Sequence, residues 1–227
     1  MLEIGPGEGA LTRELLARGA RVIAVERDPK LVTVLHNTFT GDIAEERLTV
    51  VEQDVRDFDP REHGLTQGAY TLAANIPYYI TGDIIRRFLT TEAQPTAMAL
   101  LMQKEVAERI ARSKKESLLS LSVKAYGTPR FIKKVSRGNF SPPPSVDSAI
   151  LSITNISRAF FDTISEEAFF GLLRAGFAAK RKLLSSNLAA FGKPRVMEAF
   201  QTCGVPEKAR AEDIALDTWR RLAAHLV

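Results

Sequence analysis

The first nine residues constrain the fold of this chain more than any other segment. Residues 1–4 form a short apolar run, and residues 5–9 follow as Gly-Pro-Gly-Glu-Gly. Leu11, Leu15 and Leu16 then recur at helical spacing, which indicates a helix directly after the turn. Glycines let the backbone approach a ligand closely, and the helix directs its positive N-terminal end toward it. The segment predicts a strand, a ligand-binding turn and a helix, the opening unit of an α/β sheet.

Strands and helices alternate through much of the chain, which favours a parallel sheet covered on both faces. The predicted strands are residues 1–4, 21–26, 48–53, 70–74 and 96–102, and the predicted helices 9–19, 28–39, 81–90 and 104–112. Two later strands, 130–136 and 146–154, have no helix between them and should pair antiparallel. Only helical patterns follow, near 165–180, 182–191, 195–203 and 211–226. We therefore predict an α/β domain over residues 1–156 and a helical domain over residues 157–227.

Acidic side chains end the second and third predicted strands. Glu26 comes seventeen residues after Gly9, where a carboxylate can accept hydrogen bonds from both hydroxyls of a ribose. Asp54 can accept a hydrogen bond from an adenine amino group while Val55 covers the ring; alternatively, Asp54 caps the next turn. A dinucleotide fold shares these features, but the glycines follow G-x-G-x-G spacing instead of G-x-G-x-x-G. The spacing disfavours a nicotinamide or flavin site.

A tetrapeptide after the fourth predicted strand, Asn75-Ile76-Pro77-Tyr78, suits the binding of a planar base that carries an amino group. The Asn75 amide can bond the amino group, Pro77 fixes the turn, and Tyr78 offers the face of its ring. The segment alone would also fit an ordinary exit from a strand. Together with Gly5, Gly7, Glu26 and Asp54 it indicates a ligand site, since open parallel sheets bind ligands at the carboxyl ends of their strands.

These motifs resemble those of Rossmann-like S-adenosylmethionine-dependent methyltransferases, and more narrowly those of the small-subunit rRNA adenine N6,N6-dimethyltransferases of the KsgA type. Three further segments match that family: Leu101-Met102-Gln103-Lys104-Glu105-Val106, residues 139–148 (Asn-Phe-Ser-Pro-Pro-Pro-Ser-Val-Asp-Ser) and residues 177–188 (Phe-Ala-Ala-Lys-Arg-Lys-Leu-Leu-Ser-Ser-Asn-Leu). The resemblance covers essentially the whole chain. It implies a seven-stranded sheet in the order 3-2-1-4-5-7-6, with the last-formed strand inserted antiparallel.

The resemblance also implies the cofactor, the reaction and the site. S-adenosylmethionine would be held by Gly5, Gly7, Glu26, Arg27, Asp54, Val55 and Asn75. The reaction would be dimethylation of N6 on adjacent adenosines near the 3′ end of small-subunit (16S) rRNA, in ribosome biogenesis. The catalytic residues would be Asn75, Pro77, Tyr78 and Phe140. The Asn75 side-chain oxygen and the Pro77 carbonyl would accept the two N6 hydrogens, and Tyr78 and Phe140 would contact the base; from the sequence alone, Phe140 fits equally well as a loop aromatic packed on the core.

Basic residues of the helical region are candidates for RNA binding. Arg174 and Arg181 are predicted to share one helix face, with Lys180 and Lys182 alongside. A second group, residues 130–137, contains four cations and could equally be solvated surface. The net charge of +4 and the pI near 9.3 favour a polyanionic partner. We expect the partners to be small-subunit rRNA and the immature small ribosomal subunit, with the protein a monomer.

Composition restricts the remaining classes. A single cysteine, Cys203, excludes an internal disulfide, suits a reducing cytoplasm and is expected to pack as a small apolar residue. Three scattered histidines, His36, His63 and His225, lack ligand spacing, so no metal site is expected. The sequence has no apolar run near the roughly 20 residues that span a membrane and no leader pattern. These features predict a cytoplasmic protein.

Members of this family have a helix and a loop ahead of the first strand, with a Gln-Asn-Phe-Leu-like motif that closes over the cofactor. The sequence begins at the first strand, so we expect a more open cofactor site. Two alternatives remain. One is an erythromycin-resistance-type methyltransferase, which uses the same Asn-Ile-Pro-Tyr motif on large-subunit rRNA, although residues 180–182 and 210–214 fit the KsgA type better. The other is a non-catalytic ribosome-assembly factor on the same fold.

Overall fold

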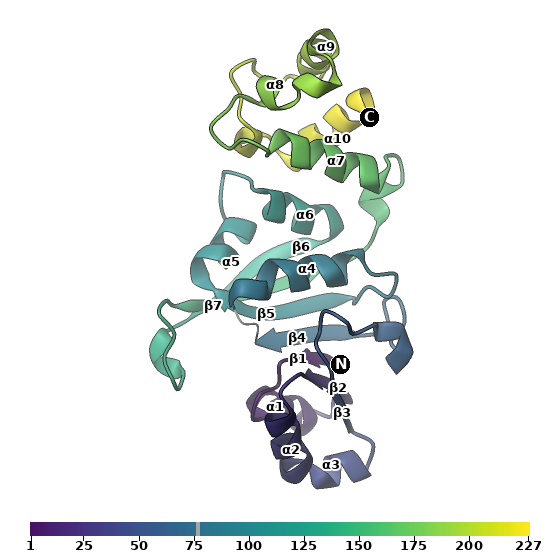
Figure 1. Cartoon of the computed structure of the whole chain (residues 1–227), viewed down its shortest axis with the longest axis vertical. Helices are drawn as coiled ribbons and strands as arrows, with labels where there is room; N and C mark the ends of the chain where they lie inside the picture. Colours follow the sequence, from purple (N-terminus) through teal and green to yellow (C-terminus); the bar gives the residue numbers. More distant parts are fainter. Residues whose placement is uncertain (76–77) are drawn as a thin grey trace. The chain divides into compact units, whose positions relative to one another are not determined.

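The computed structural model describes residues 1–75 and 78–227, and of Tyr78 only the backbone (Figure 1). The strands are β1 (Leu2–Ile4), β2 (Val22–Glu26), β3 (Leu48–Glu52), β4 (Thr71–Asn75), β5 (Ala97–Gln103), β6 (Thr128–Val135) and β7 (Ser148–Thr154). The α-helices are α1 (Ala10–Ala17), α2 (Pro29–Thr38), α3 (Thr40–Ala44), α4 (Thr81–Thr90), α5 (Lys104–Ala111), α6 (Leu118–Tyr126), α7 (Glu166–Gly176), α8 (Leu184–Asn187), α9 (Lys193–Cys203) and α10 (Leu216–Leu226).

The seven strands form one sheet in the order β3-β2-β1-β4-β5-β7-β6. The pairs from β3 to β5 are parallel, and β7 runs antiparallel to β5, with Leu100 opposite Leu151. The predicted fold class and strand order are therefore confirmed, including the antiparallel insertion of the last-formed strand. The order places the carboxyl ends of β1, β2, β3 and β4 along one edge.

Local sequence explains how α1 and α2 pack on the sheet. The Asp28 side chain caps α2 by accepting a hydrogen bond from the Lys30 backbone N–H at 2.9 Å, and Pro29 occupies the first turn. Leu16, Leu35 and Phe39 are buried against strand residues in a small core. Burial of such a side chain contributes about 1.5–3 kcal/mol, so this core holds the two helices beside the glycine turn.

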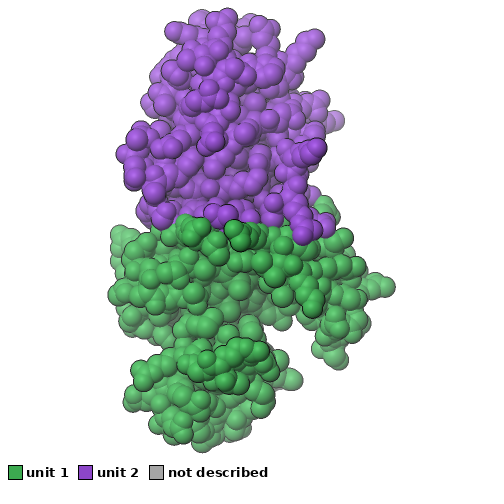
Figure 2. All heavy atoms as spheres, turned by 180° about the vertical axis from the view of Figure 1, so that it is seen from behind, with its two compact units in different colours: residues 1–107, 130–156 green, residues 108–129, 157–227 purple. Residues whose placement is uncertain are grey.

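The structure consists of two compact units, coloured separately in Figure 2. The first contains residues 1–107 and 130–156, and the second contains residues 108–129 and 157–227. The chain divides after residue 156, and residues 108–129 belong with the C-terminal helices. Leu121 and Ala125 of α6 are buried in the same apolar cluster as those helices, and the Tyr126 hydroxyl donates to Glu166 Oε1 at 2.6 Å. Helix α6 was not predicted from the sequence.

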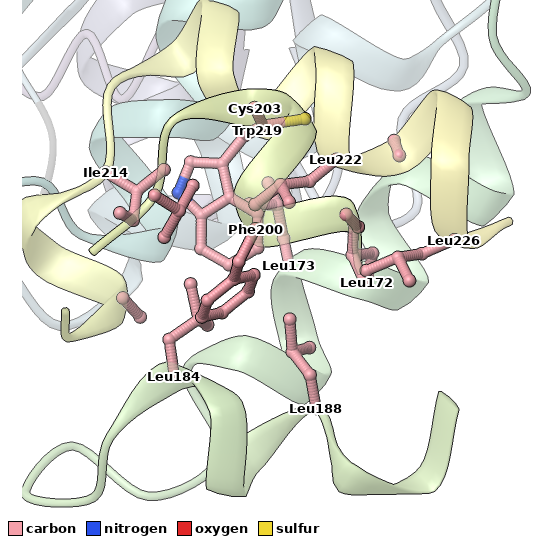
Figure 3. Close-up of a cluster of buried hydrophobic side chains, with 14 of the residues drawn as sticks. Leu172, Leu173, Leu184, Leu188, Phe200, Cys203, Ile214, Trp219, Leu222 and Leu226 are labelled. Carbon is pink, nitrogen blue, oxygen red and sulfur yellow. The ribbon is translucent and has the colours of Figure 1, made fainter. Parts of the chain in front are cut away.

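Trp219 lies at the centre of the core of the second unit (Figure 3). It is fully buried, together with Phe200, Leu173 and Leu184. Cys203 is buried and unpaired in this cluster, which confirms its predicted packing role. Gly176 lies so close to Trp219 that a Cβ would come within 2.4 Å of the indole ring. The glycine therefore allows α7 to end against the tryptophan.

The end of α7 corrects one prediction. The helix stops at Gly176, so Arg174 and Arg181 do not share a helix face. The Asn187 side-chain amide donates to the Gly176 carbonyl at 2.6 Å and to the Ala179 carbonyl at 3.1 Å. These bonds hold the chain in a turn that begins after the last helical residue. Predicted helix 182–191 is shortened to α8 and a following 3₁₀ turn, residues 189–191.

Candidate cofactor and catalytic site

A cavity of about 290 Å³ lies at the carboxyl edge of the parallel strands in the first unit. Its lining comes from the ends of β1, β2 and β4, from the segments that follow the four strands β1 to β4, and from α2. The lining residues are Ile4, Gly5, Gly7, Val25, Glu26, Arg27, Leu31, Gln53, Asp54, Val55, Arg56, Asn75, Tyr79 and Ile80. All seven residues predicted to bind the cofactor are among them. Residues more than seventy positions apart in the sequence thus meet in one cavity.

The glycines of the turn have different roles. Gly7 has a φ of +60°, and an added Cβ would meet no atom within 4 Å. The backbone of Gly7 is therefore directly accessible from the cavity. Gly9 has a φ of +85°, but its Cβ would come within 2.3 Å of the Phe39 ring. Gly5 and Gly7 both line the cavity, whereas Gly9 does not and instead permits α1 to pack on the end of α2. The sequence alone did not reveal this packing role.

The Glu26 carboxylate is held in place by backbone donors. Its Oε1 accepts from the backbone N–H groups of Arg27 at 2.9 Å and Asp28 at 3.0 Å. Its Oε2 accepts from the Gly7 N–H at 3.3 Å. The side chain is buried, and Oε2 keeps acceptor capacity at the cavity wall. A fixed, ionisable acceptor beside an open glycine backbone fits a ligand that carries vicinal hydroxyls.

Asp54 both caps a turn and lines the cavity. Its Oδ1 accepts a hydrogen bond from the Arg56 backbone N–H at 2.9 Å. Asp54 thus caps the turn, as in the alternative that the sequence left open. The Arg56 side chain also bonds both carboxylate oxygens, and this pairing holds the pKa of Asp54 well below its usual range. Arg27 Nη1 lies 3.8 Å from Asp54 Oδ2. Asp54 therefore remains an ionised acceptor, and Val55 next to it is buried.

Glu3 lies beneath the glycine turn and was missed by sequence reasoning. Only 1% of its surface is exposed, and its Oε2 accepts from the Thr12 hydroxyl at 2.7 Å, which ties β1 to α1. Its Oε1 has no hydrogen-bond partner among the described residues. Burial raises the pKa of Glu3 to about 6. An acidic residue within an otherwise apolar strand, two positions before the first glycine, was the available signal.

The predicted catalytic residues are described to different extents. Asn75 is the last residue of β4, is exposed and lines the cavity; a Cβ on Gly5 would lie 3.6 Å from its carbonyl oxygen. Pro77 and the Tyr78 side chain lie outside the described residues. Phe140 is half-buried in the loop between β6 and β7 and does not line the cavity. Tyr79, which sequence reasoning did not select, lines the cavity and is 74% exposed.

The predicted RNA-binding residues are all in the second unit. Arg174 lies in α7, and Lys180, Arg181 and Lys182 lie in the turn that follows it. All four side chains are exposed, and within the part of the chain that the structure describes none forms an ion pair or hydrogen bond. In the other basic group, by contrast, Lys134 pairs with Asp147 at 2.7 Å. The four cations are available to an anionic partner.

Residues 1–75 and 78–227 contain neither a metal-binding cluster nor a membrane-spanning helix. No group of three or more His, Cys, Asp or Glu side chains in these ranges could hold a metal ion. No helix in the same ranges combines the length and apolar character needed to cross a membrane.

The sheet order, the glycine turn and the acidic strand ends define the class: a Rossmann-like S-adenosylmethionine-dependent methyltransferase. The chain belongs to the ribosomal RNA adenine dimethylase family, whose model matches residues 1–226. The ribosomal RNA small subunit methyltransferase A of Dehalococcoides mccartyi strain CBDB1 is 39% identical over 98% of this chain and 77% of its own length. The protein of the same name from Fusobacterium nucleatum is 37% identical over 98% of this chain and 84% of its own length.

Two solved structures share the fold of this chain. The 23S rRNA methyltransferase ErmE is 26% identical, with a TM-score of 0.76 over 99% of this chain and 89% of its own. A dimethyladenosine transferase from Plasmodium falciparum shares the fold, with a TM-score of 0.80 and 24% identity over 97% of this chain and 87% of its own.

Proposed function

We propose that this protein transfers methyl groups from S-adenosylmethionine to N6 of adjacent adenosines near the 3′ end of small-subunit rRNA. The observation that carries the proposal is the cavity at the strand ends, where the turn glycines, Glu26, Asp54 and Asn75 meet. Family membership supplies the reaction class, and relatives named for the small subunit favour that RNA over the large-subunit rRNA on which ErmE acts. A non-catalytic role is disfavoured, because each described residue of the expected cofactor site is present at the cavity.

The residues of the cavity fit this cofactor. Glu26 would hold the ribose hydroxyls, because its carboxylate is already fixed by backbone N–H groups and keeps acceptor capacity on Oε2. Asp54 would accept from the adenine amino group, Val55 would cover the ring, and Arg27 would contribute positive charge nearby. Gly5 and Gly7 would let the backbone approach the cofactor closely. The bound cofactor supplies an electrophilic methyl group.

Asn75 would act on the nucleophile. Adenine N6 is a weak nucleophile because its lone pair is delocalised into the ring. The Asn75 side-chain oxygen and the Pro77 carbonyl would accept its two hydrogens, which localises the lone pair and stabilises the positive charge that develops on nitrogen. The exposed end of β4 at the cavity supports this role for Asn75. Tyr78 and Phe140 would stack on the extruded base, with a gain of about 1–3 kcal/mol for each stacked base.

The second unit would bind the RNA backbone through Arg174, Lys180, Arg181 and Lys182. Their exposure and lack of partners among the described residues support this role. The natural substrate would be the immature small ribosomal subunit in the cytoplasm, and the protein would act as a monomer. A chain with a net charge of +4 suits such a polyanionic particle.

Mass spectrometry of rRNA nucleosides tests the proposal. A strain that lacks the gene should lose N6,N6-dimethyladenosine from small-subunit rRNA, and the restored gene should return it. The Asn75→Ala variant should not return it, although it should still bind cofactor. Dimethyladenosine that disappears from large-subunit rRNA instead would favour the erythromycin-resistance type. Full modification by Asn75→Ala would contradict the catalytic assignment.

A further inference from the structure

Most of the acceptor capacity of Asp54 is already used by one residue. Oδ1 accepts from the Arg56 backbone N–H at 2.9 Å and from Arg56 Nε at 3.0 Å. Oδ2 accepts from Arg56 Nη2 at 2.6 Å. A carboxylate oxygen offers about two lone-pair sites. The remaining acceptor site is therefore on Oδ2, and the plane of the carboxylate is fixed by a two-point contact with a planar guanidinium.

The same local arrangement occurs a few residues later. Asp59 accepts from the Arg61 backbone N–H at 2.9 Å and from Arg61 Nη2 at 2.8 Å. Aspartate followed two positions later by arginine thus forms this turn without any help from a ligand site. Asp54 and Arg56 differ from the second pair in that both line the cavity at the strand ends, whereas Asp59 and Arg61 do not. The second pair provides an internal control for the first.

We propose that Arg56 is a positioning residue that determines specificity for the purine ring of the cofactor. It orients Asp54 so that the free site on Oδ2 accepts from an amino group at purine C6 and opposes an oxo group there. This inference rests on the proposed role of Asp54. Arg56 itself is exposed, with 66% of its side chain accessible, so its removal leaves the core of the first unit intact.

The physical basis is preorganisation. A carboxylate that is already oriented loses little side-chain freedom when it accepts from the amino group, and ordering one free side chain weakens binding by roughly 3- to 10-fold. The same fixed carboxylate cannot rotate away from an oxo group, so two acceptors are forced together. Without the Arg56 guanidinium, Asp54 keeps only the hydrogen bond from the backbone N–H of residue 56 to Oδ1, and the plane of its carboxylate can rotate. The affinity for the amino ligand should then fall, and the affinity for the oxo ligand should rise.

Calorimetry with two ligands tests the inference. The ligands are S-adenosylhomocysteine and its hypoxanthine counterpart, which carries an oxo group at C6. We expect the ratio of their affinities to fall roughly tenfold in Arg56→Ala, and to stay at the wild-type value in Arg61→Ala. Arg56→Lys keeps the charge but not the two-point contact, and should resemble Arg56→Ala. A wild-type ratio in either Arg56 variant, or tighter binding of the adenosyl ligand, would overturn the proposal.

A further variant separates this inference from the proposed function. Asp54→Asn should weaken binding of the adenosyl ligand and abolish the preference for the amino group. If Asp54→Asn binds both ligands as wild type does, the adenine role of Asp54 fails, and the inference about Arg56 fails with it. If Asp54→Asn loses the preference while Arg56→Ala keeps it, the site assignment stands and only the positioning role of Arg56 is refuted.

Discussion

Substitution of Gly9 by alanine tests whether the third glycine of the turn is required for packing. Its backbone has a φ of +85°, and the new Cβ would lie 2.3 Å from Phe39 Cε2 and 3.1 Å from Leu35 Cδ2. Both neighbours are buried in the core beneath the turn, so neither can move away without disturbing other side chains. The alanine must displace α1, the aromatic ring or both.

The expected magnitude has two parts. A left-handed backbone disfavours an L-residue by about 1–2 kcal/mol. Overpacking a well-filled core adds about 1–3 kcal/mol. Gly9→Ala should therefore destabilise the fold by about 2–5 kcal/mol. Gly19 provides the matched control, because it has a φ of +78° but no atom within 4 Å of an added Cβ. Gly19→Ala should show the backbone part alone.

Urea denaturation of both variants, followed by circular dichroism, measures the difference. Its midpoint should fall further in Gly9→Ala than in Gly19→Ala, by an amount equivalent to about 1–3 kcal/mol. Affinity for S-adenosylhomocysteine should also fall in Gly9→Ala only, because α1 begins directly after the turn. Equal destabilisation in the two variants would refute the packing role of Gly9 and leave only a backbone requirement.

Four other changes give separate tests. Glu26→Ala should weaken cofactor binding by about 1.5–3 kcal/mol, measured by calorimetry; unchanged affinity would exclude the ribose role. Asn75→Ala should lower the single-turnover methylation rate by roughly 10²–10³ with little change in cofactor affinity, and a near-normal rate would refute catalysis by the amide. Joint replacement of Arg181 and Lys182 by alanine should reduce the slope of log RNA affinity against log salt by about 0.7–0.9 per lost phosphate contact. An unchanged slope would show that neither side chain contacts RNA. Burial raises the pKa of Glu3 from 4.5 to about 6, so the folded state is more stable when this carboxyl is protonated. The free energy of unfolding should fall by about 2 kcal/mol as the pH rises through this window. Urea denaturation at several pH values should show this fall in the wild type but not in Glu3→Gln.

Sequence patterns predicted the sheet well because its determinants are local. Apolar runs, strand-end polar residues and the glycine turn each occupy a few consecutive positions, and the order of the strands followed from the family resemblance. Glu26, Asp54 and Asn75 were placed at one edge because parallel strands end together. The structure confirms the strand order and brings these three side chains to one cavity.

The features that sequence reasoning missed depend on contacts between distant residues. Helix α7 was extended too far because its end is set by Trp219 and Asn187, which lie 43 and 11 residues beyond Gly176. Residues 108–129 belong to the second unit because α6 makes apolar contacts with its helices, and no local sequence pattern predicts these contacts. The contact of the Arg56 guanidinium with both oxygens of Asp54 is local but was not predicted, because the spacing of two residues does not fix the direction of the Arg56 side chain.

The insertion of β7 between β5 and β6 has a consequence for synthesis on the ribosome. Strand β5 ends at Gln103, but its neighbour β7 begins only at Ser148. At roughly 5–20 residues per second, the unpaired edge of β5 is exposed for roughly 2–9 s while the intervening 45 or so residues are made. The intervening chain includes residues 108–129, which form the second unit only together with residues 157–227. The nascent chain therefore offers an open, apolar strand edge to chaperones until β7 is made, and the second unit stays incomplete until the C-terminal helices follow.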